Sequence, residues 1–433
     1  MMEQLKQTAR TAVEILTAKG AEKAQCDVGY SITHEFNVDG GEFSLFRTLF
    51  DKHLVLTAIK DGKKGTVRQN RYDGETVTEA AETCLETAAS SVSDPAWDIA
   101  PLTENHDFTY GVVTGDHEKL FSRCRELLGD IAARYPRILI EQMIVMHKEI
   151  GSVFANSNGV LQAEHCGYYS VDLMFSAHEG EKASSFFGCG FLTDNLDMPF
   201  IECASLAKDL SDVEKQTDTE TLDGKFDGVM LLPPAALNSF LDYTFSNFVS
   251  DGALLQGTSP WKDRLGKAVA DSSLTVSAAP LDDRIVCGSR VTADGHVSEN
   301  YDILRDGVLN QFMLSLYVAN KTGLTRAPNS TSNLIVKPGE RSLADLIASI
   351  ERGIIVGRFS GGEPSSNGDF SGVAKNSFLI ENGKVTKALS ETMISGNLAD
   401  MMIHLHGLSK ETVSDGMCVL PYAAFCGITV SGK

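Results

Sequence analysis

The order of helix-like and strand-like stretches is the feature that most restricts the fold of this chain. Residues 1–20 have apolar side chains at helical spacing and end at a glycine. Three strand-like stretches follow, with Asp-Gly turn signals at 39–40 and 61–62: 26–36, 41–50 and 53–60. Helical spacing returns at 72–92 and 116–135. Because helices and strands come in blocks without regular alternation, we predict an α+β fold of mostly antiparallel sheets with packed helices.

The remainder of the chain suggests a division into two domains. Residues 137–180 predict at least three strands with a turn at 156–159, and 199–216 predicts a helix. Helices are then expected at about 234–250 and at 397–405, among these strand-like stretches: 273–279, 284–292, 307–318, 332–339, 353–362, 376–385 and 427–432.

The length of 433 residues exceeds what one core usually supports. The polar stretch 216–228 offers little to a core, so it is the expected linker. We therefore predict an N-terminal α+β domain at 1–215 and a β-rich C-terminal domain at 229–433.

Charge disfavours nucleic acid and anionic membranes as partners. The chain has 38 basic and 58 acidic side chains, a formal net charge of −20. Such a field repels phosphate groups unless a basic patch reverses it locally, and the cluster from Lys60 to Arg71 has the composition of a hairpin tip. No apolar run approaches the length of a membrane span, and the N-terminal segment lacks the apolar block of a signal peptide.

Nine cysteines without a CxxC pair are typical of a cytoplasmic protein rather than of a disulfide framework or a zinc ribbon. Common catalytic strings are absent: there is no phosphate-binding GxxxxGK[ST], no GxGxxG and no GxSxG. Three His-Glu dipeptides lack a second histidine four or five residues later, so none forms a zinc-protease motif. His404 and His406, with Cys418, are the remaining weak metal candidates, although two positions on a helix point about 200° apart.

Several stretches together resemble the TldD/PmbA family, long labelled modulators of DNA gyrase and understood as metallopeptidase subunits. The resemblance covers roughly the last 280 residues in a conserved order of motifs: ANSNG at 155–159, the helix and GTS turn of 239–261, 299–323, 359–385, SGNLADMM at 395–402 and the terminal GITVSG. The first 150 residues match only in their pattern of helices and hairpins. The family implies a role in proteolysis of unfolded or small peptides.

The family has two branches, and the helix before the GTS turn distinguishes them. TldD-like members carry HExxxH there, and a cysteine near the C-terminus completes the zinc site. In this chain the corresponding window is DYTFSN at 242–247, and no histidine occurs between His178 and His296. The chain therefore resembles the TldE/PmbA branch. That resemblance implies no catalytic or metal-binding residue in this chain, zinc on a TldD-like partner, a heterodimer around an extended peptide, and a possible homodimer in isolation.

The candidate scaffold or peptide-groove residues come from two segments. In the helix, Leu237, Phe240 and Phe245 belong to an apolar stripe, and the opposite side is polar. This helix is either a packed scaffold or a wall facing a partner or peptide. The glycine-rich segment forms either tight turns or backbone open to main-chain pairing. The candidates are Asp242, Tyr243, Ser246, Asn247, Gly257, Thr258, Ser259, Gly361, Gly362, Gly368 and Asp369.

Three functions remain open. The first is a TldE/PmbA-like subunit that holds no metal and supports a cytoplasmic TldD/TldE-type metallopeptidase. The second is a module that binds peptides without hydrolysing them. The third is an independent hydrolase with a diverged site around His404, His406 and Cys418. A pull-down that identifies a metalloprotease partner separates the first from the second, and elemental analysis of the isolated protein tests the third.

Overall fold

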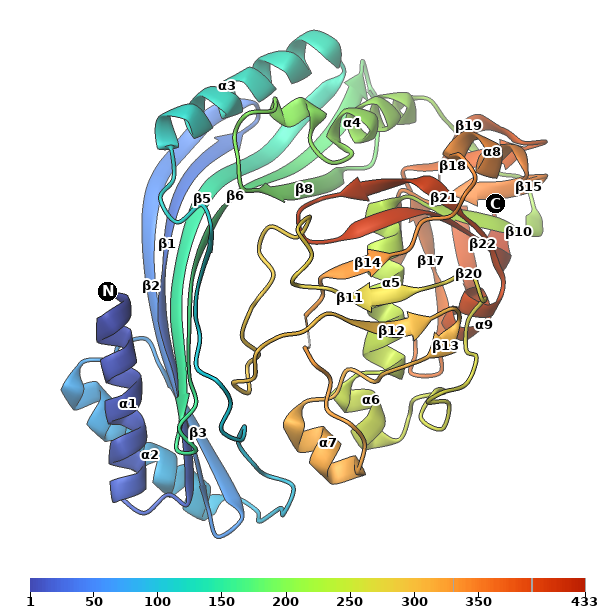
Figure 1. Ribbon diagram of the computed structural model, residues 1–433. Helices are drawn as coiled ribbons and strands as arrows, with labels where there is room; N and C mark the ends of the chain where they lie inside the picture. The colour runs from blue at the N-terminus through green and yellow to red at the C-terminus, as the bar shows by residue number, and fades with distance from the viewer. Residues whose placement is uncertain (330, 391, 433) are drawn as a thin grey trace.

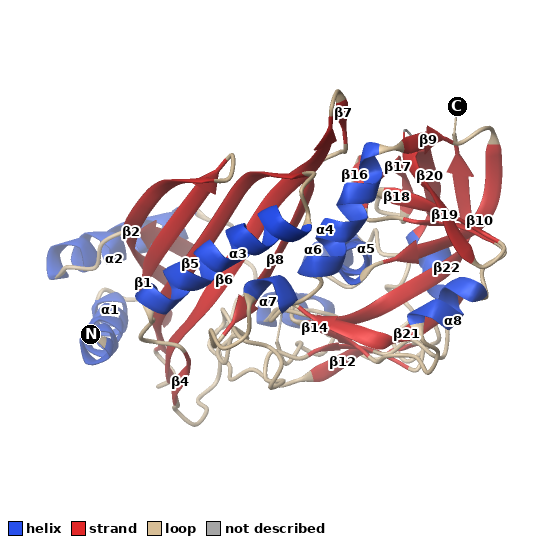
Figure 2. Ribbon diagram, turned by 90° about the horizontal axis from the view of Figure 1, so that it is seen from above, coloured by secondary structure: helices blue, strands red, loops and turns tan. Residues whose placement is uncertain are grey.

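The computed structural model describes residues 1–329, 331–390 and 392–432, and it contains two β-sheets with helices packed against them (Figure 1). Most strand pairs are antiparallel. The predicted α+β class is therefore confirmed. Figure 2 shows the two sheets beside each other, with the N-terminal sheet next to the C-terminal half of the chain.

The N-terminal sheet has the strand order β3-β2-β1-β5-β6-β4, with β7 and β8 also paired to β6. Its strands are β1 (Lys23–Asp39), β2 (Glu42–Lys60), β3 (Lys63–Gln69), β4 (Asp107–Gly111), β5 (Ile138–Asn156), β6 (Leu161–Glu179), β7 (Lys182–Ala183) and β8 (Phe187–Thr193). Tight turns connect the long strands, and Gly40, Gly62 and Gly159 have the positive φ angles that these turns require. The four long strands curve around the C-terminal half of the molecule (Figure 1).

Two details of the predicted strands were wrong. The stretches 41–50 and 53–60 are one continuous strand, β2, because Asp51 and Lys52 between them pair with β1 and form no turn. Residues 137–180 form two long strands, β5 and β6, instead of three. Strands of this length are unusual, so a sequence pattern is more readily divided into shorter ones.

Helices cover the N-terminal sheet in two groups (Figure 1). They are α1 (Met2–Ala18), α2 (Gly74–Ser90), α3 (His117–Arg134) and α4 (Leu206–Glu214), with 3₁₀ turns η1 (Phe200–Glu202) and η2 (Lys215–Thr217). Asp73 and Asp116 cap α2 and α3 by accepting hydrogen bonds from backbone N–H groups. The helix predicted over 199–216 is shorter, because Ala204 has a φ of 48° and interrupts it.

The second sheet contains the remaining strands. They are β9 (Thr219–Thr221), β10 (Lys225–Leu232), β11 (Val276–Ala278), β12 (Tyr301–Arg305), β13 (Val308–Leu309), β14 (Leu334–Val336), β15 (Arg352–Ile355), β16 (Arg358–Gly361), β17 (Asp369–Lys375), β18 (Ser377–Glu381), β19 (Lys384–Ser390), β20 (Thr392–Asn397), β21 (Leu405–Ser414) and β22 (Val419–Ser431). Its helices are α5 (Pro234–Phe248), α6 (Asp251–Gln256), α7 (Leu316–Thr322), α8 (Leu343–Ala348) and α9 (Leu398–Ile403). β22 lies at the centre and pairs with β10, β14, β20 and β21.

Two predicted strands of this half were wrong in part. Residues 284–292 form turns instead of a strand, because Gly288 packs against the backbone of Pro280. Residues 316–322, at the end of a predicted strand, form α7, which Ser315 caps by accepting a hydrogen bond from the N–H of Val318.

The expected linker is structured along part of its length. Residues 216–228 include β9 and the start of β10, and Leu222 and Phe226 are buried in the core of the second sheet. Gln216 is also buried, and its side-chain amide donates to the carbonyl of Ser377. The domain boundaries at 215 and 229 stay a prediction, and residues 330, 391 and 433 of the second domain lie outside the described residues.

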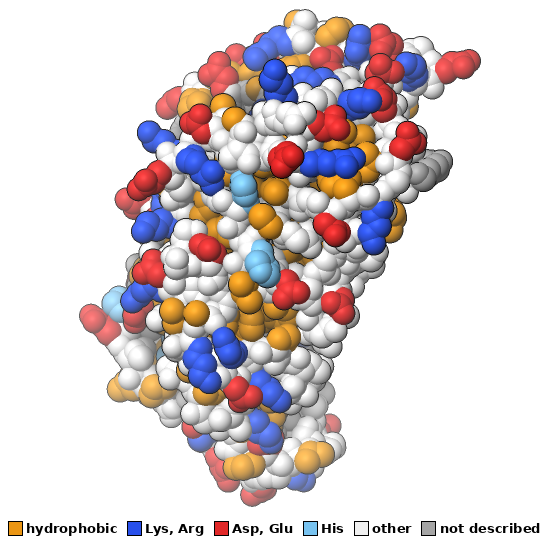
Figure 3. Space-filling model, turned by 90° about the vertical axis from the view of Figure 1, so that its right-hand side faces the viewer, with side chains coloured by type: hydrophobic (Ala, Val, Ile, Leu, Met, Phe, Trp, Pro, Cys, Tyr) orange, Lys and Arg blue, Asp and Glu red, His pale blue; other side chains and the backbone are white. Residues whose placement is uncertain are grey.

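The surface has charges of both signs. On the face shown in Figure 3, lysine and arginine side chains alternate with aspartate and glutamate, and no basic stripe crosses it. Within the described ranges, no helix combines the length and the apolar character needed to cross a membrane.

Candidate functional site

Helix α5 is the element that the sequence singled out, and its burial follows the predicted stripe. Pro234 stands at the first helical position, where proline loses no hydrogen bond. Phe240, Leu241 and Phe248 are fully buried in the C-terminal core. Thr244 lies among them and satisfies its hydroxyl by donating to the carbonyl of Phe240 at 2.7 Å. The helix is therefore held firmly on one side.

The other side of α5 borders a cavity. Asp242 and Ser246, one helical turn apart, are exposed and line a cavity of about 270 Å³. The rest of the lining is mixed: Phe245, Ser250, Asp251, Met313, Ser332 and Leu334. Two carboxylates and three hydroxyls thus face the same space as three apolar side chains. This arrangement suits hydrogen bonding to a polar ligand more than metal binding.

Tyr243 and Asn247 do not share this cavity. The ring of Tyr243 lies edge-on to Phe240 and Phe359, with centroids 6.2 and 6.4 Å away. The Asn247 amide donates to the carbonyl of Tyr243 at 2.9 Å. The polar side predicted for the helix is therefore divided, and only Asp242 and Ser246 of those four residues line the cavity.

The GTS turn, residues 257–259, follows α6 and is hydrogen-bonded to the end of α5. Gly257 ends α6 in the left-handed conformation, with φ of 68°. Ser259 is buried, donates to the carbonyl of Phe248 at 2.5 Å and accepts from the N–H of Trp261. The backbone N–H of Thr258 donates to Ala253, and its side chain is exposed. Ser259 therefore fixes the turn against the end of α5.

The glycine-rich segment also reaches α5. Gly368 has a φ of 94°, and a Cβ atom there would come within 2.8 Å of the Phe248 ring. Gly361 lies against Gly372 in the β16–β17 pair, and Gly362 faces open space. Asp369 accepts hydrogen bonds from the amides of Asn397 and Asn367, and these bonds hold its pKa below the ordinary value. At Gly368, close packing against α5 is what requires glycine.

Cys418 lies beside α5 and contacts Asn238, which is one helical turn before Asp242. Its thiol donates to the carbonyl of Ser332 at 3.3 Å and to Oδ1 of Asn238 at 3.5 Å. Burial raises the pKa of this thiol to about 12, so it stays protonated at neutral pH. A single cysteine without imidazole partners would hold zinc weakly.

The three weak metal candidates do not come together. His406 accepts or donates a hydrogen bond with Ser349 at 2.9 Å and lies 3.8 Å from the sulfur of Cys426. His404 bonds the carbonyl of Asp400. Cys418 lies at the opposite end of the β21–β22 hairpin. Among the residues that the structure describes, no group of three or more His, Cys, Asp or Glu side chains is arranged to hold a metal ion.

Sequence reasoning missed part of the cavity wall. Asp251 accepts a hydrogen bond from the N–H of Ser315 at 2.9 Å, and this bond joins α6 to the start of α7. Met313 and Ser332 come from segments that are distant in the sequence. Ser250 had a usable signal, because it follows Asp242 and Ser246 at intervals of four residues.

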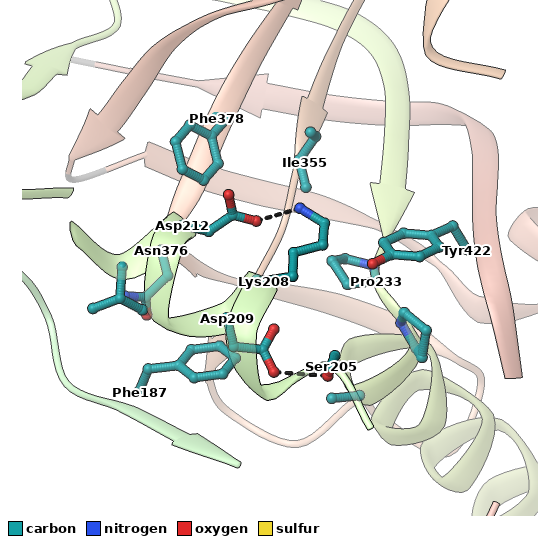
Figure 4. Close-up of a pocket in the computed structure, with 14 residues that line it drawn as sticks. Phe187, Ser205, Lys208, Asp209, Asp212, Pro233, Ile355, Asn376, Phe378 and Tyr422 are labelled. Atoms are coloured by element: carbon teal, nitrogen blue, oxygen red, sulfur yellow. Dashed lines mark hydrogen bonds and ion pairs between the residues drawn. The ribbon is translucent and has the colours of Figure 1, made fainter. Parts of the chain in front are cut away.

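A second cavity lies between α4 and the C-terminal half (Figure 4). Asp209 points into it and accepts a hydrogen bond from Ser205 at 2.7 Å, while Lys208 pairs with Asp212. Burial raises the pKa of Asp209 to about 7. The enclosed space is about 30 Å³, enough for about one water molecule. This site is therefore too small for a peptide.

Comparison with known proteins defines the class of this fold and site. Residues 227–432 match the PmbA/TldA metallopeptidase C-terminal domain, which includes α5, the GTS turn and Cys418. This half of the chain is therefore similar to the PmbA/TldD family, and several curated relatives of the chain are named metalloproteases.

Two curated relatives and one solved structure extend the match beyond that domain. Metalloprotease PmbA of Escherichia coli O157:H7 is 24% identical over 96% of this chain and 93% of its own. An uncharacterized protein of Methanocaldococcus jannaschii is 24% identical over 90% of this chain and 92% of its own. The crystal structure of TldE from Thermococcus kodakarensis has a TM-score of 0.85 at 17% identity, covering 98% of this chain and 99% of that one. The last comparison shows that the two proteins share a fold.

Proposed function

We propose that this chain is a TldE/PmbA-like subunit, without a metal of its own, of a cytoplasmic TldD/TldE-type metallopeptidase that acts on unfolded or small peptides. A TldD-like subunit supplies the zinc, and this chain supplies part of the wall around an extended peptide. The family match, the relatives named PmbA and the shared fold with TldE support this proposal.

The observation that carries the proposal is the composition of α5 beside Cys418. A catalytic zinc site takes about three protein ligands, commonly imidazoles with a carboxylate or thiolate. Here the helix offers the Asp242 carboxylate and the Ser246 hydroxyl, and the neighbouring Cys418 belongs to no group of three or more possible metal ligands among the described residues. The helix, the turn and the cysteine are thus present as a scaffold, without the ligands that zinc requires.

The cavity beside α5 suits one wall of a larger chamber. Complete ligand pockets are usually about 300–1,000 Å³. The cavity of about 270 Å³ is smaller, yet it offers a carboxylate, hydroxyls and the apolar Met313 and Leu334. Polar groups of this kind can pair with the main chain of a peptide, and the apolar ones can contact its side chains.

An exposed strand edge supports the subunit role. β3 pairs with β2 only over Leu54–Lys60, so the outer edge of residues 42–53 has no strand beside it among the described residues. Phe46 and Phe50 on this edge are 54% and 71% exposed. Unpaired edges and exposed apolar groups are typical of surfaces that bind another chain. We assign this edge to contact with the sister subunit.

Activity and metal content together test the proposal. The purified chain alone is expected to hold less than stoichiometric zinc and to leave an unfolded casein-derived peptide intact. Addition of a TldD-type subunit from the same host is expected to produce cleavage that a chelator abolishes. Zinc-dependent cleavage by this chain alone would overturn the proposal. Peptide binding without cleavage in the presence of the TldD-type subunit would favour the peptide-binding module instead.

A matched pair of variants tests the role of the cavity. Ser246→Trp places a large side chain in the cavity, so we expect cleavage by the assembled complex to fall about tenfold or more. Ser239→Trp makes the same change at an exposed position of α5 that does not line the cavity, and full activity is expected. Equal activity of the two variants would show that the cavity does not receive the peptide.

A further inference from the structure

One loop of the C-terminal half reaches the N-terminal sheet and is fixed at several points. Ile285 is buried, and the N–H of Val286 donates to the carbonyl of Gly416. Gly288 packs so closely on Pro280 that a Cβ atom would lie 1.9 Å from its carbonyl oxygen. These contacts fix residues 285–288, including Cys287, against the rest of the C-terminal half.

The loop docks on β6 through a buried carboxylate. Glu164 accepts hydrogen bonds from the N–H of Arg290 at 2.5 Å and from the hydroxyl of Ser289 at 3.2 Å. Tyr110 on β4 donates to the same carboxylate at 3.0 Å. The Arg290 guanidinium lies 4.7 Å from the centre of the Tyr110 ring. Three separate contacts therefore join the loop to the sheet.

Two free thiols meet at this junction. Cys166 follows Glu164 by two residues on β6, so both side chains lie on the same face of the sheet. Cys166 and Cys287 line one cavity of about 390 Å³, together with Glu164 and Ser289 of the docking contact. The interaction with Cys287 lowers the pKa of Cys166, whereas the interaction with Cys166 and burial raise the pKa of Cys287. The pair thus favours the thiolate at Cys166.

We propose that Cys166 and Cys287 form a reversible disulfide that links the N-terminal sheet to the C-terminal half. The oxidant is a small diffusible disulfide that enters the cavity. The Cys166 thiolate attacks one of its sulfur atoms and releases one thiolate, which leaves a mixed disulfide on Cys166. Cys287 loses its proton to solvent and attacks the sulfur of Cys166, which expels the second small thiol. Two protein thiols are oxidised, and one small disulfide is reduced to two thiols.

The position of the bond gives it a consequence for the whole chain. The two cysteines are about 120 residues apart in the sequence, so the bond closes a long loop of the unfolded chain. It also holds the 285–291 loop on β6, which forms one side of the cavity. Cys26 and Cys84 are buried in one helix-covered core and Cys124 in the other, and none of the three lines this cavity.

Thiol counting and peptide mapping test this proposal. The full chain is treated with 2-hydroxyethyl disulfide, freed of reagent and digested without reduction. We expect free thiols to fall from nine to seven per chain, a peptide linking Cys166 to Cys287 by mass spectrometry, and full reversal by dithiothreitol. Cys287→Ser is expected to leave no internal disulfide. Cys426→Ser, which removes an unrelated half-buried thiol, should still lose two thiols.

Two outcomes would overturn the proposal. One is a thiol count that stays at nine after treatment, and the other is a linked peptide that joins a different pair. Both are read on the unmodified chain, so a folding defect in a variant does not affect the result.

Discussion

Asp209 places a protonatable group at the junction of α4 and the C-terminal half (Figure 4). Its pKa is about 7 in the folded chain because of burial, against an ordinary value of 3.8. Below pH 4 both states hold the proton. Between pH 4 and 7 the unfolded chain releases it and the folded chain retains it, so stability falls as the pH rises.

We therefore expect Asp209→Asn to raise the free energy of unfolding at pH 7.5 by about 1–3 kcal/mol, because the neutral amide avoids ionisation in the cavity. Urea denaturation at pH 4.5 and 7.5 measures the difference. At pH 4.5 the gain is expected to shrink toward zero. A gain of equal size at both pH values would mean that ionisation is not its cause.

The partly buried ion pair of Arg326 and Asp294 gives a second prediction for single residues. Arg326 donates to both carboxylate oxygens, at 2.5 and 2.8 Å, and this pairing holds the pKa of Asp294 far below its ordinary value against the opposing effect of burial. Arg326→Met leaves a partly buried carboxylate without its cationic partner, so we expect a loss of about 2–3 kcal/mol of stability.

The control for this change is Arg305→Met, which removes an exposed partner of Asp302. Its expected cost is below about 1 kcal/mol. Thermal unfolding at the same pH compares the stabilities of the two variants directly. A similar loss of stability in both would show that burial of the ion pair does not determine its contribution.

At the scale of elements, helix α3 rests on a group of three imidazoles. His117 at its start lies 4.1 Å from His34, measured between ring centres, and 3.4 Å from Nδ1 of His147. The ring of His147 donates to the carbonyl of Val112 at 2.7 Å. The pKa values of His117 and His147 lie below 6.5, mainly because of burial and to a smaller extent because of the neighbouring imidazoles.

Below pH 6.5 the unfolded chain binds protons that the folded chain resists, so this group weakens the fold as the pH falls. Hydrogen exchange of the α3 amides is expected to accelerate between pH 6.5 and 5.5 after correction for the intrinsic rate. His117→Gln should reduce this change, and His178→Gln, at an exposed position, should not. Identical pH profiles for both variants would exclude the imidazole group as the cause.

Much of α5 could be predicted from the sequence, and much of its surroundings could not. The apolar stripe and the turn signals are local patterns, so they located the helix and its buried side. The division of the polar side depends on where Phe359, Met313 and Ser332 come to lie, and these residues are about 70–115 positions away. No pattern within the helix carries that information.

The same limit applies to the whole molecule. The order of helices and strands along the chain was sufficient to predict the α+β class, because each element is recognised from the local spacing of its apolar residues. The length of β2 and the docking of the 285–291 loop depend on partners elsewhere in the chain: β1 pairs with β2 through Asp51 and Lys52, and Glu164 receives the loop. The pair of Cys166 and Cys287 was therefore invisible in the sequence.

The position of β1 between β2 and β5 has a consequence for synthesis of the chain on the ribosome. β1 ends at Asp39, yet its second neighbour is complete only at Asn156. At about 5–20 residues per second, roughly 6–23 s pass between these two points. During that interval the edge of β1 that later pairs with β5 is unpaired and can associate with other nascent chains. We therefore expect a chaperone to bind the chain during its synthesis.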